Sequence, residues 1–165
     1  MNLLKNFLWL KDISCISFME SCFEIIENTN DLEVIDSILL SYDNRFIRRK
    51  KLTSNNGIEF IVNLAETKSL FHNQAFKLES NKLILIKSQS EKLLEITGDN
   101  LMKLIWHIGN RHMPCQIEEN RVVIQYDKVI KSMILQLGGV AKEIVEPFNP
   151  EGGAYGVGRT HSHKH

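Results

Sequence analysis

Three histidines at the carboxyl end of the chain are the side chains whose type and spacing point most directly to chemistry. His161, His163 and His165 alternate with other residues over the last five positions. Imidazole nitrogen suits Ni²⁺, Cu²⁺ and Zn²⁺, and alternating histidines on a mobile segment can converge on one ion. Because ordering such a segment costs about 1–2 kcal/mol per residue, it binds the ion loosely. The pattern favours carrying a metal ion; a purification tag is the alternative, although a tag is normally an unbroken histidine run.

His112 is the second candidate metal ligand, and it ends the sequence Gly109-Asn110-Arg111-His112. Apolar residues at helical spacing precede it, so we expect His112 at the end of a helix or on the turn that follows. One imidazole binds an ion weakly, but a symmetric dimer doubles the ligand because a residue near a two-fold axis meets its own copy. A hydrogen-bonded structural histidine is the alternative. Cys115 lies close by, and both a mixed cysteine and histidine site and a small core residue fit it.

The sequence lacks the motifs that identify the common enzyme classes. It contains no G-x-S-x-G, P-loop, H-E-x-x-H or Rossmann glycine pattern, and no pair of acidic residues is placed for acid–base catalysis. A metal-dependent hydrolase needs three preorganised ligands and an open position, for which a mobile tail is poorly suited. We therefore expect a protein that is not an enzyme and has no catalytic residues.

Composition and charge limit the partners and the compartment. The 165 residues include 20 Lys and Arg against 20 Asp and Glu, so the formal net charge is zero and gives no basic surplus for nucleic acid. No apolar run approaches the roughly 20 residues of a membrane helix, and residues 1–18 lack the unbroken apolar core of a secretion signal. The three cysteines, Cys15, Cys22 and Cys115, are odd in number and lack C-x-x-C spacing. We expect a cytoplasmic protein whose partners include neither nucleic acid nor a membrane.

The first half of the chain is predicted to be β-rich, and we assign residues 1–92 to one domain that begins with an uncertain extension. The turn sequence Asn55-Asn56-Gly57 leads into an apolar segment and is a strong hairpin signal. Strands are expected at Ile58–Val62, Gln74–Leu78 and Lys82–Lys87.

Two segments of this half stay open between interpretations. The apolar spacing of Asp31–Leu40 fits a short helix and a strand equally. The basic run Arg45–Lys51 is consistent with a solvated strand edge guarded by charge, and contact with an acidic partner or RNA is the alternative.

The second half has a clearer pattern and predicts a ferredoxin-like domain over residues 93–148. The order is strand, helix, strand, strand, helix, strand, which is a split βαβ unit with both helices on one face of an antiparallel sheet. The elements are expected at Leu93–Ile96, Leu101–Ile108, Cys115–Glu118, Val122–Gln125, Val129–Leu137 and Val140–Val145. Residues 149–165, rich in glycine and histidine, cannot bury a core and are expected to form a flexible tail. The predicted fold class is therefore α+β.

Two motifs, followed by the histidine-bearing end, resemble one protein family. The first is His107-Ile108-Gly109-Asn110-Arg111-His112-Met113-Pro114, and the second is Pro147-Phe148-Asn149-Pro150-Glu151-Gly152-Gly153-Ala154-Tyr155-Gly156. In this order they resemble urease accessory protein E (UreE), the nickel metallochaperone of urease. The resemblance extends roughly from Arg45 to the end of the chain and is strongest from Leu93 onward.

The resemblance implies a β-domain similar to the peptide-binding domain of heat-shock co-chaperones, followed by a ferredoxin-like domain through which a homodimer forms. It implies Ni²⁺ as the metal, with His112 of both subunits as the principal ligand and His161, His163 and His165 completing the coordination. Zn²⁺ and Cu²⁺ compete for such ligands. As partners the resemblance implies the urease apoprotein and the accessory GTPase UreG, in a complex with other accessory proteins.

The sequence departs from the family at an auxiliary metal site. Many relatives carry Asp-His-Val at the start of the second helix, where this chain has Asp127-Lys128-Val129, and a lysine that is cationic near neutral pH is a poor ligand. With three tail histidines, we expect one shared ion per dimer and no storage of several. Two other functions are alternatives: a protein-interaction adaptor without metal, and a ferredoxin-like RNA-binding module. The latter needs exposed aromatics on its middle strands, where the sequence offers Tyr126.

Overall fold

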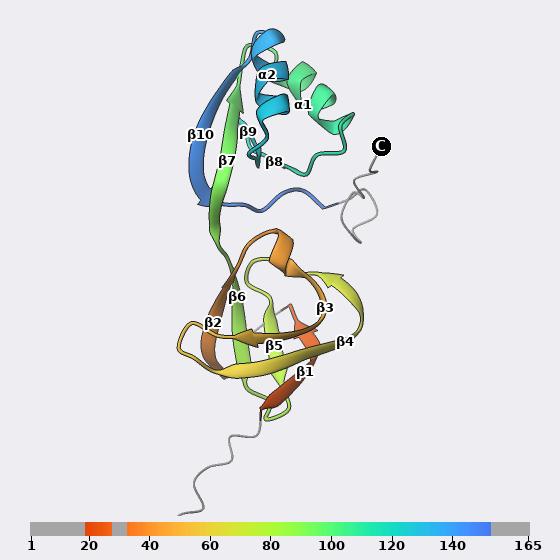
Figure 1. The fold of residues 1–165 in the computed structure, drawn as a ribbon, viewed down its shortest axis with the longest axis vertical. Helices are drawn as coiled ribbons and strands as arrows, with labels where there is room; N and C mark the ends of the chain where they lie inside the picture. The colour runs from red at the N-terminus through yellow and green to blue at the C-terminus, as the bar shows by residue number, and fades with distance from the viewer. Residues whose placement is uncertain (1–18, 28–32, 153–165) are drawn as a thin grey trace, which may run out of the picture.

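The structure, a computed structural model, describes residues 19–27 and 33–152 and has the α+β class predicted from the sequence. Its strands form two sheets, and both α-helices pack against the second sheet (Figure 1). The first part contains β1 (Glu20–Ile26), β2 (Val34–Leu40), a 3₁₀ turn η1 (Asp43–Arg45), β3 (Phe46–Thr53), β4 (Glu59–Ser69), β5 (Ala75–Leu78) and β6 (Leu83–Ser88). The second contains β7 (Ser90–Thr97), α1 (Leu101–Gly109), β8 (Cys115–Ile117), β9 (Val122–Gln125), α2 (Lys128–Gln136) and β10 (Val140–Pro147). Within the described ranges, no helix has the length and apolar character needed to cross a membrane.

The first sheet has the strand order β2-β6-β5-β1-β4-β3. The segment Asp31–Leu40, whose sequence fits a helix and a strand equally, contains strand β2 of this sheet. β2 pairs in parallel with β6, with Ile38 opposite Ile86. Asp36, Ile38 and Leu40 are buried, and the residues between them are more exposed. This period of two is that of a strand with one face on the core. Pairing with β6, which lies far along the chain, favours the strand over a helix.

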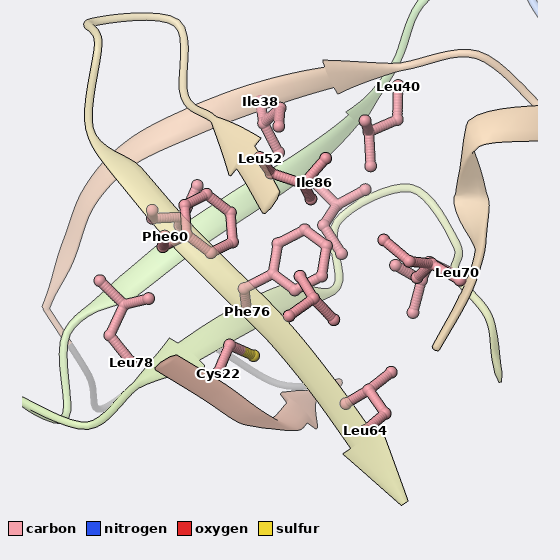
Figure 2. Close-up of a cluster of buried hydrophobic side chains, with 13 residues drawn as sticks. Cys22, Ile38, Leu40, Leu52, Phe60, Leu64, Leu70, Phe76, Leu78 and Ile86 are labelled. Atoms are coloured by element: carbon pink, nitrogen blue, oxygen red, sulfur yellow. The ribbon is translucent and has the colours of Figure 1, made fainter. Parts of the chain in front are cut away.

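Alternating residues of the first sheet bury one apolar cluster (Figure 2). Phe60 of β4 and Phe76 of β5 are fully buried, and their ring centroids lie 5.3 Å apart. Cys22 of β1 belongs to the same cluster. The hairpin that joins β3 to β4 is the one that Asn55-Asn56-Gly57 predicts, and Gly57 has a φ of 91°, which glycine adopts without steric penalty.

The second sheet has the strand order β10-β7-β9-β8, and each neighbouring pair is antiparallel. Both helices cover one face (Figure 1), where Leu104, Ile108, Ile130 and Ile134 are buried against the strands. The order of elements along the chain is the one expected from the sequence. The first strand begins at Ser90, earlier than the predicted start at residue 93, because its first residues pair with the end of β10.

Side-chain caps fix the starts of both helices. Asn100 accepts a hydrogen bond from the Lys103 amide at 3.1 Å. Asp127 accepts hydrogen bonds from the amides of Val129 and Ile130 at 2.7 and 2.9 Å. These bonds satisfy N–H groups of the first turn that have no acceptor within the helix.

Arg121, just before β9, forms ion pairs with three glutamates in or next to the strands of the second sheet. Its guanidinium lies 2.7 Å from Glu118, 2.8 Å from Glu95 and 3.0 Å from Glu146. The hydrogen bond from Arg121 is the main cause that lowers the pKa of Glu118 below its ordinary value. A carboxylate with a lowered folded-state pKa stabilises the fold above its unfolded pKa and loses this contribution as the pH falls through the folded-state value.

We expect Arg121→Met to lower the melting temperature at pH 7, because three carboxylates then lose their shared cation. At pH 3, below the ordinary glutamate pKa of about 4.3, the same substitution is expected to have a smaller effect. Thermal unfolding of both proteins at the two pH values measures this. Lys142→Met is the matched control, since Lys142 is exposed and lies 4.0 Å from Glu95. An equal loss at both pH values would contradict the charge-based explanation.

Candidate metal centre

His112 lies on the turn that connects α1 to β8. Leu104 and Ile108, one helical turn apart, anchor α1 in the core. Beyond the helix, the Arg111 amide donates to the Ile108 carbonyl at 3.0 Å, and the His112 amide donates to the Gly109 carbonyl at 2.8 Å. The sequence predicts His112 at the end of the helix or on the turn that follows, and the structure places it on the turn.

The backbone of His112 has a conformation that few residues other than glycine adopt. Its φ is 55°, in the left-handed region, and its side chain is exposed. Such conformations cost of order 1–3 kcal/mol and persist where the surrounding structure enforces them, frequently at functional sites. We call the buried apolar residues between the two helices and the second sheet, which include Leu104, Ile108, Ile130 and Ile134, the helix cluster. Helix α1 lies before the turn, and Met113, which packs against the helix cluster, lies after it. The turn is therefore held from both sides.

The chain that follows β10 returns to β8 before it reaches the histidine-rich end. We call Phe148–Glu151 the exit segment. The Asn149 amide donates to Gln116 Oε1 at 2.7 Å, and the Glu151 amide donates to the Cys115 carbonyl at 2.8 Å. Figure 1 shows this part of the chain crossing between the two sheets toward the loop after α1. The exit segment therefore lies against the strand that begins just after His112.

The predicted ligands His161, His163 and His165 lie outside the described residues. An extended chain spans about 3.3–3.6 Å per residue, so the stretch from Gly152 to His161 reaches up to roughly 30 Å. Three peptide units separate His112 from Cys115, so their Cα atoms lie within about 11 Å of each other. Across residues 19–27 and 33–152, no three His, Cys, Asp or Glu residues gather into a group that could hold a metal ion.

Both cysteines of the described residues, Cys22 and Cys115, have thiols whose pKa is raised above the ordinary value. Burial is the main cause that raises the pKa of Cys115, and the charge of Glu151 adds to it. Burial also raises the pKa of Cys22 to about 11. The raised pKa values disfavour the thiolate, the form that binds a metal, in the metal-free protein. Cys115 packs partly buried against the helix cluster, which favours the core-residue interpretation over a mixed cysteine and histidine site.

The auxiliary position implied by the family resemblance is engaged in capping α2. The carboxylate of Asp127 accepts two amide hydrogen bonds there, and the exposed residue that follows is Lys128. A carboxylate used as a helix cap beside a cationic ammonium group is a poor pair of ligands for a transition metal.

The interpretation of Arg45 as part of a solvated basic run is wrong. Arg45 is 3% exposed, whereas Arg48–Lys51 are exposed on β3, an edge strand of the first sheet. The Arg45 guanidinium donates to the Phe148 carbonyl and, at 3.3 Å, to Asn149 Oδ1. Sequence reasoning missed this contact because the four cations that follow made Arg45 look like one of them, and its acceptors lie 103 and 104 residues further on.

Apolar packing closes the face of the second sheet opposite the helices. Leu93 of β7 and Val123 of β9, on the two middle strands, are buried together with Phe148. Tyr42, which precedes η1, packs edge-on against the Phe148 ring with centroids 5.3 Å apart. Recognition of single-stranded RNA on such a sheet needs exposed aromatics on the middle strands. The geometry therefore disfavours the RNA-binding alternative.

Comparison with known proteins relates this sequence to a class of accessory proteins. Residues 91–165 match the family described as UreE urease accessory protein, C-terminal domain. The urease accessory protein UreE of Ruegeria pomeroyi is 52% identical over 147 residues, which cover 89% of this chain and 99% of that protein. Proteins of the same name from Ruegeria sp. and Rhodobacter capsulatus are 52% and 48% identical. These alignments cover 76% and 79% of this chain, and 72% and 83% of the relatives.

The chain therefore belongs to the UreE family of urease accessory proteins. The two motifs that carry the resemblance in the sequence contain the His112 turn, which precedes β8, and the exit segment, which is hydrogen-bonded to β8.

Proposed function

We propose that this protein is a nickel metallochaperone, a non-catalytic carrier that binds Ni²⁺ and delivers it for assembly of the urease active site. The ligands in this proposal are His112, His161, His163 and His165. Membership of the UreE family supports a role in urease maturation. Imidazole ligands suit nickel but also bind Zn²⁺ and Cu²⁺, so both ions compete, and coordination geometry and metal supply select nickel.

The observation that carries the proposal is the approach of two segments to the start of β8. The turn before β8 exposes His112, and the exit segment is hydrogen-bonded to Cys115, the first residue of the strand. The Cα atom of His112 lies within about 11 Å of that of Cys115, and the chain from Gly152 to His161 is long enough to span at most roughly 30 Å. The tail histidines can therefore join His112 on one ion.

A homodimer supplies the second fixed imidazole in this proposal. A two-fold axis near His112 brings the two copies of the residue together on one ion, which sets one shared Ni²⁺ per dimer. Met102 and Trp106 of α1, the helix that leads to His112, are largely exposed. Large apolar side chains exposed together are typical of a surface that another chain covers.

Loose binding suits delivery to the partners we propose, the urease apoprotein and the GTPase UreG in a complex with other accessory proteins in the cytoplasm. Each tail imidazole can be replaced in turn by a ligand of the recipient.

Nickel titration with simultaneous mass determination tests the proposal. We expect one Ni²⁺ per dimer for the full chain, and binding at least about tenfold weaker for a chain that ends at residue 160, because the tethered ligands are lost. A full-length chain with His161→Gln, His163→Gln and His165→Gln is the matched control for tail length. A monomer that does not bind nickel at neutral pH would refute the proposal and favour the metal-free adaptor.

A further inference from the structure

The hairpin that joins β3 to β4 carries the only asparagine–glycine step in the sequence, Asn56-Gly57. Glycine has no side chain that would keep its backbone nitrogen away from the preceding asparagine, and a Cβ atom added at Gly57 would meet no other atom within 4 Å. Both residues are exposed, so water reaches them. An exposed asparagine followed by an unhindered nitrogen has the chemistry to lose its side-chain amide.

This reaction, deamidation, needs only the protein and water. The Gly57 nitrogen attacks the side-chain carbon Cγ of Asn56, the new N–Cγ bond closes a succinimide ring, and the Cγ–Nδ2 bond breaks. Nδ2 leaves as ammonia and takes with it the proton that the Gly57 nitrogen loses. Water then opens the ring at either carbonyl and leaves aspartate or isoaspartate at position 56. The balance is water consumed and ammonia released, with nothing oxidised or reduced.

A buried carboxylate on another strand opposes the first step. Asp36 of β2, 8% exposed, accepts from Asn56 Nδ2 at 2.9 Å and from the Asn56 amide at 3.0 Å. A hydrogen bond from the Ser54 side chain is the main cause that lowers the pKa of Asp36, so near neutral pH this group is an ionised acceptor. The Gly57 amide donates to the Ser54 carbonyl at 3.1 Å. The carboxamide of Asn56 is therefore held toward β2, and the attacking nitrogen keeps a hydrogen-bonded proton.

The same contact joins the two edges of the first sheet. β2 and β3 are its edge strands, and the hairpin after β3 reaches β2 at two neighbouring residues. Asp36 accepts from Asn56, and Ser37 accepts from the Asn55 amide at 2.8 Å and from Asn55 Nδ2 at 3.0 Å. We call these contacts the sheet seam. An aspartate in place of Asn56 would set a second carboxylate against Asp36, and two carboxylates that share a site repel each other.

We infer that Asn56 is a deamidation site that Asp36 keeps closed, and that its conversion to aspartate or isoaspartate opens the sheet seam irreversibly. While the carboxamide is bound to Asp36, it cannot turn its carbon toward the Gly57 nitrogen. Once the carboxamide has reacted, the grip is replaced by repulsion, and the hairpin cannot return to the same contact. The inference concerns the first sheet alone and does not depend on nickel binding.

Peptide mapping of the metal-free protein tests whether Asp36 keeps the site closed. The full-length wild-type protein, Asp36→Ala and a synthetic peptide of residues 52–68 are incubated at mildly alkaline pH. Mass spectrometry after trypsin then follows aspartate and isoaspartate at position 56. We expect the folded wild type to react at least about tenfold more slowly than the peptide, and Asp36→Ala at least about tenfold faster than the wild type. A hydrogen bond to a charged group favours the bound side chain by about that factor or more.

Ser37→Ala is the matched control for the rate, because it removes the side-chain contact of Asn55 and leaves the grip of Asp36 on Asn56 in place. Its deamidation rate is expected to equal that of the wild type. Asp36→Asn, a neutral and therefore weaker acceptor of the same shape, serves if Asp36→Ala does not fold, and it is expected to react faster than the wild type. Folded Asp36 variants that react at the wild-type rate, or a wild type that reacts as fast as the peptide, overturn the inference.

Thermal unfolding tests whether the product opens the sheet seam. Asn56→Asp is expected to lower the melting temperature by at least about 2–4 °C, whereas Asn55→Asp, which faces the Ser37 hydroxyl, is expected to change it less. The double variant Asp36→Asn with Asn56→Asp has one carboxylate at the contact again and should regain most of the loss. An unchanged melting temperature for Asn56→Asp, or no recovery in the double variant, shows that the product does not open the seam by repulsion.

Discussion

Nickel binding by the full chain is expected to weaken by at least about 100-fold when His112 is replaced by asparagine. Loss of a side chain that only orients a metal ligand costs about 10–100-fold in metal affinity, so loss of the ligand itself has a larger effect. In the proposed homodimer one substitution also removes two imidazoles from the shared ion. Competition against a chromophoric nickel chelator gives the dissociation constants of both proteins.

Asparagine is the suitable replacement because of the backbone at this position. With a φ of 55°, the residue must tolerate the left-handed region, which asparagine does more readily than most residues. The turn is therefore expected to keep its shape while the imidazole is lost. His112→Gly complements this variant, since glycine adopts the conformation without strain. A glycine variant that gains thermal stability and loses nickel binding separates the ligand role from a structural one.

His107→Asn is the control for nonspecific loss of an imidazole. His107 lies on α1, and its ring packs edge-on against Trp106 with centroids 5.0 Å apart. We expect its replacement to leave the nickel affinity unchanged. Should folded His112→Asn bind nickel as tightly as the unmodified protein, His112 is not a ligand and the candidate centre is wrong.

The second sheet could be predicted from the sequence because its signals are local. Helix α1 follows from apolar residues three and four positions apart, and β9 has the predicted bounds Val122–Gln125. In the first sheet, the sequence pattern does not predict β1 as a separate strand. It pairs in parallel with β4 and antiparallel with β5, and its own sequence has one fully buried residue, Cys22. Partners distant in sequence, which no local pattern reveals, determine that strand.

The same distinction applies to the candidate site. His112 could be selected from its residue type and its place in a recognisable motif, although its left-handed backbone could not. Arg45 could not be selected, because its role depends on a carbonyl and a side chain more than 100 residues away. A buried cation and an exposed one have the same letter in a basic run, and only the fold distinguishes them.

Phe60→Ala is expected to lower the free energy of unfolding of the protein by about 3–5 kcal/mol. Phe60 is fully buried in the cluster drawn in Figure 2, with its ring centroid 5.3 Å from that of Phe76. Truncation removes the burial of the ring and leaves a cavity that a sheet held by cross-strand pairing can close only in part. The loss is a large share of the roughly 5–15 kcal/mol by which domains are stable. Urea unfolding followed by circular dichroism measures it.

Phe23→Ala is the matched control, because Phe23 lies on β1 of the same sheet but is 55% exposed. Its truncation is expected to change stability by no more than about 0.5 kcal/mol, and similar losses for both variants would contradict the burial of Phe60. Phe60 belongs to a different cluster from the residues that anchor the His112 turn. Nickel binding by the folded Phe60→Ala protein should therefore survive, because the His112 turn is held by the helix cluster and does not depend on how tightly the first sheet is packed.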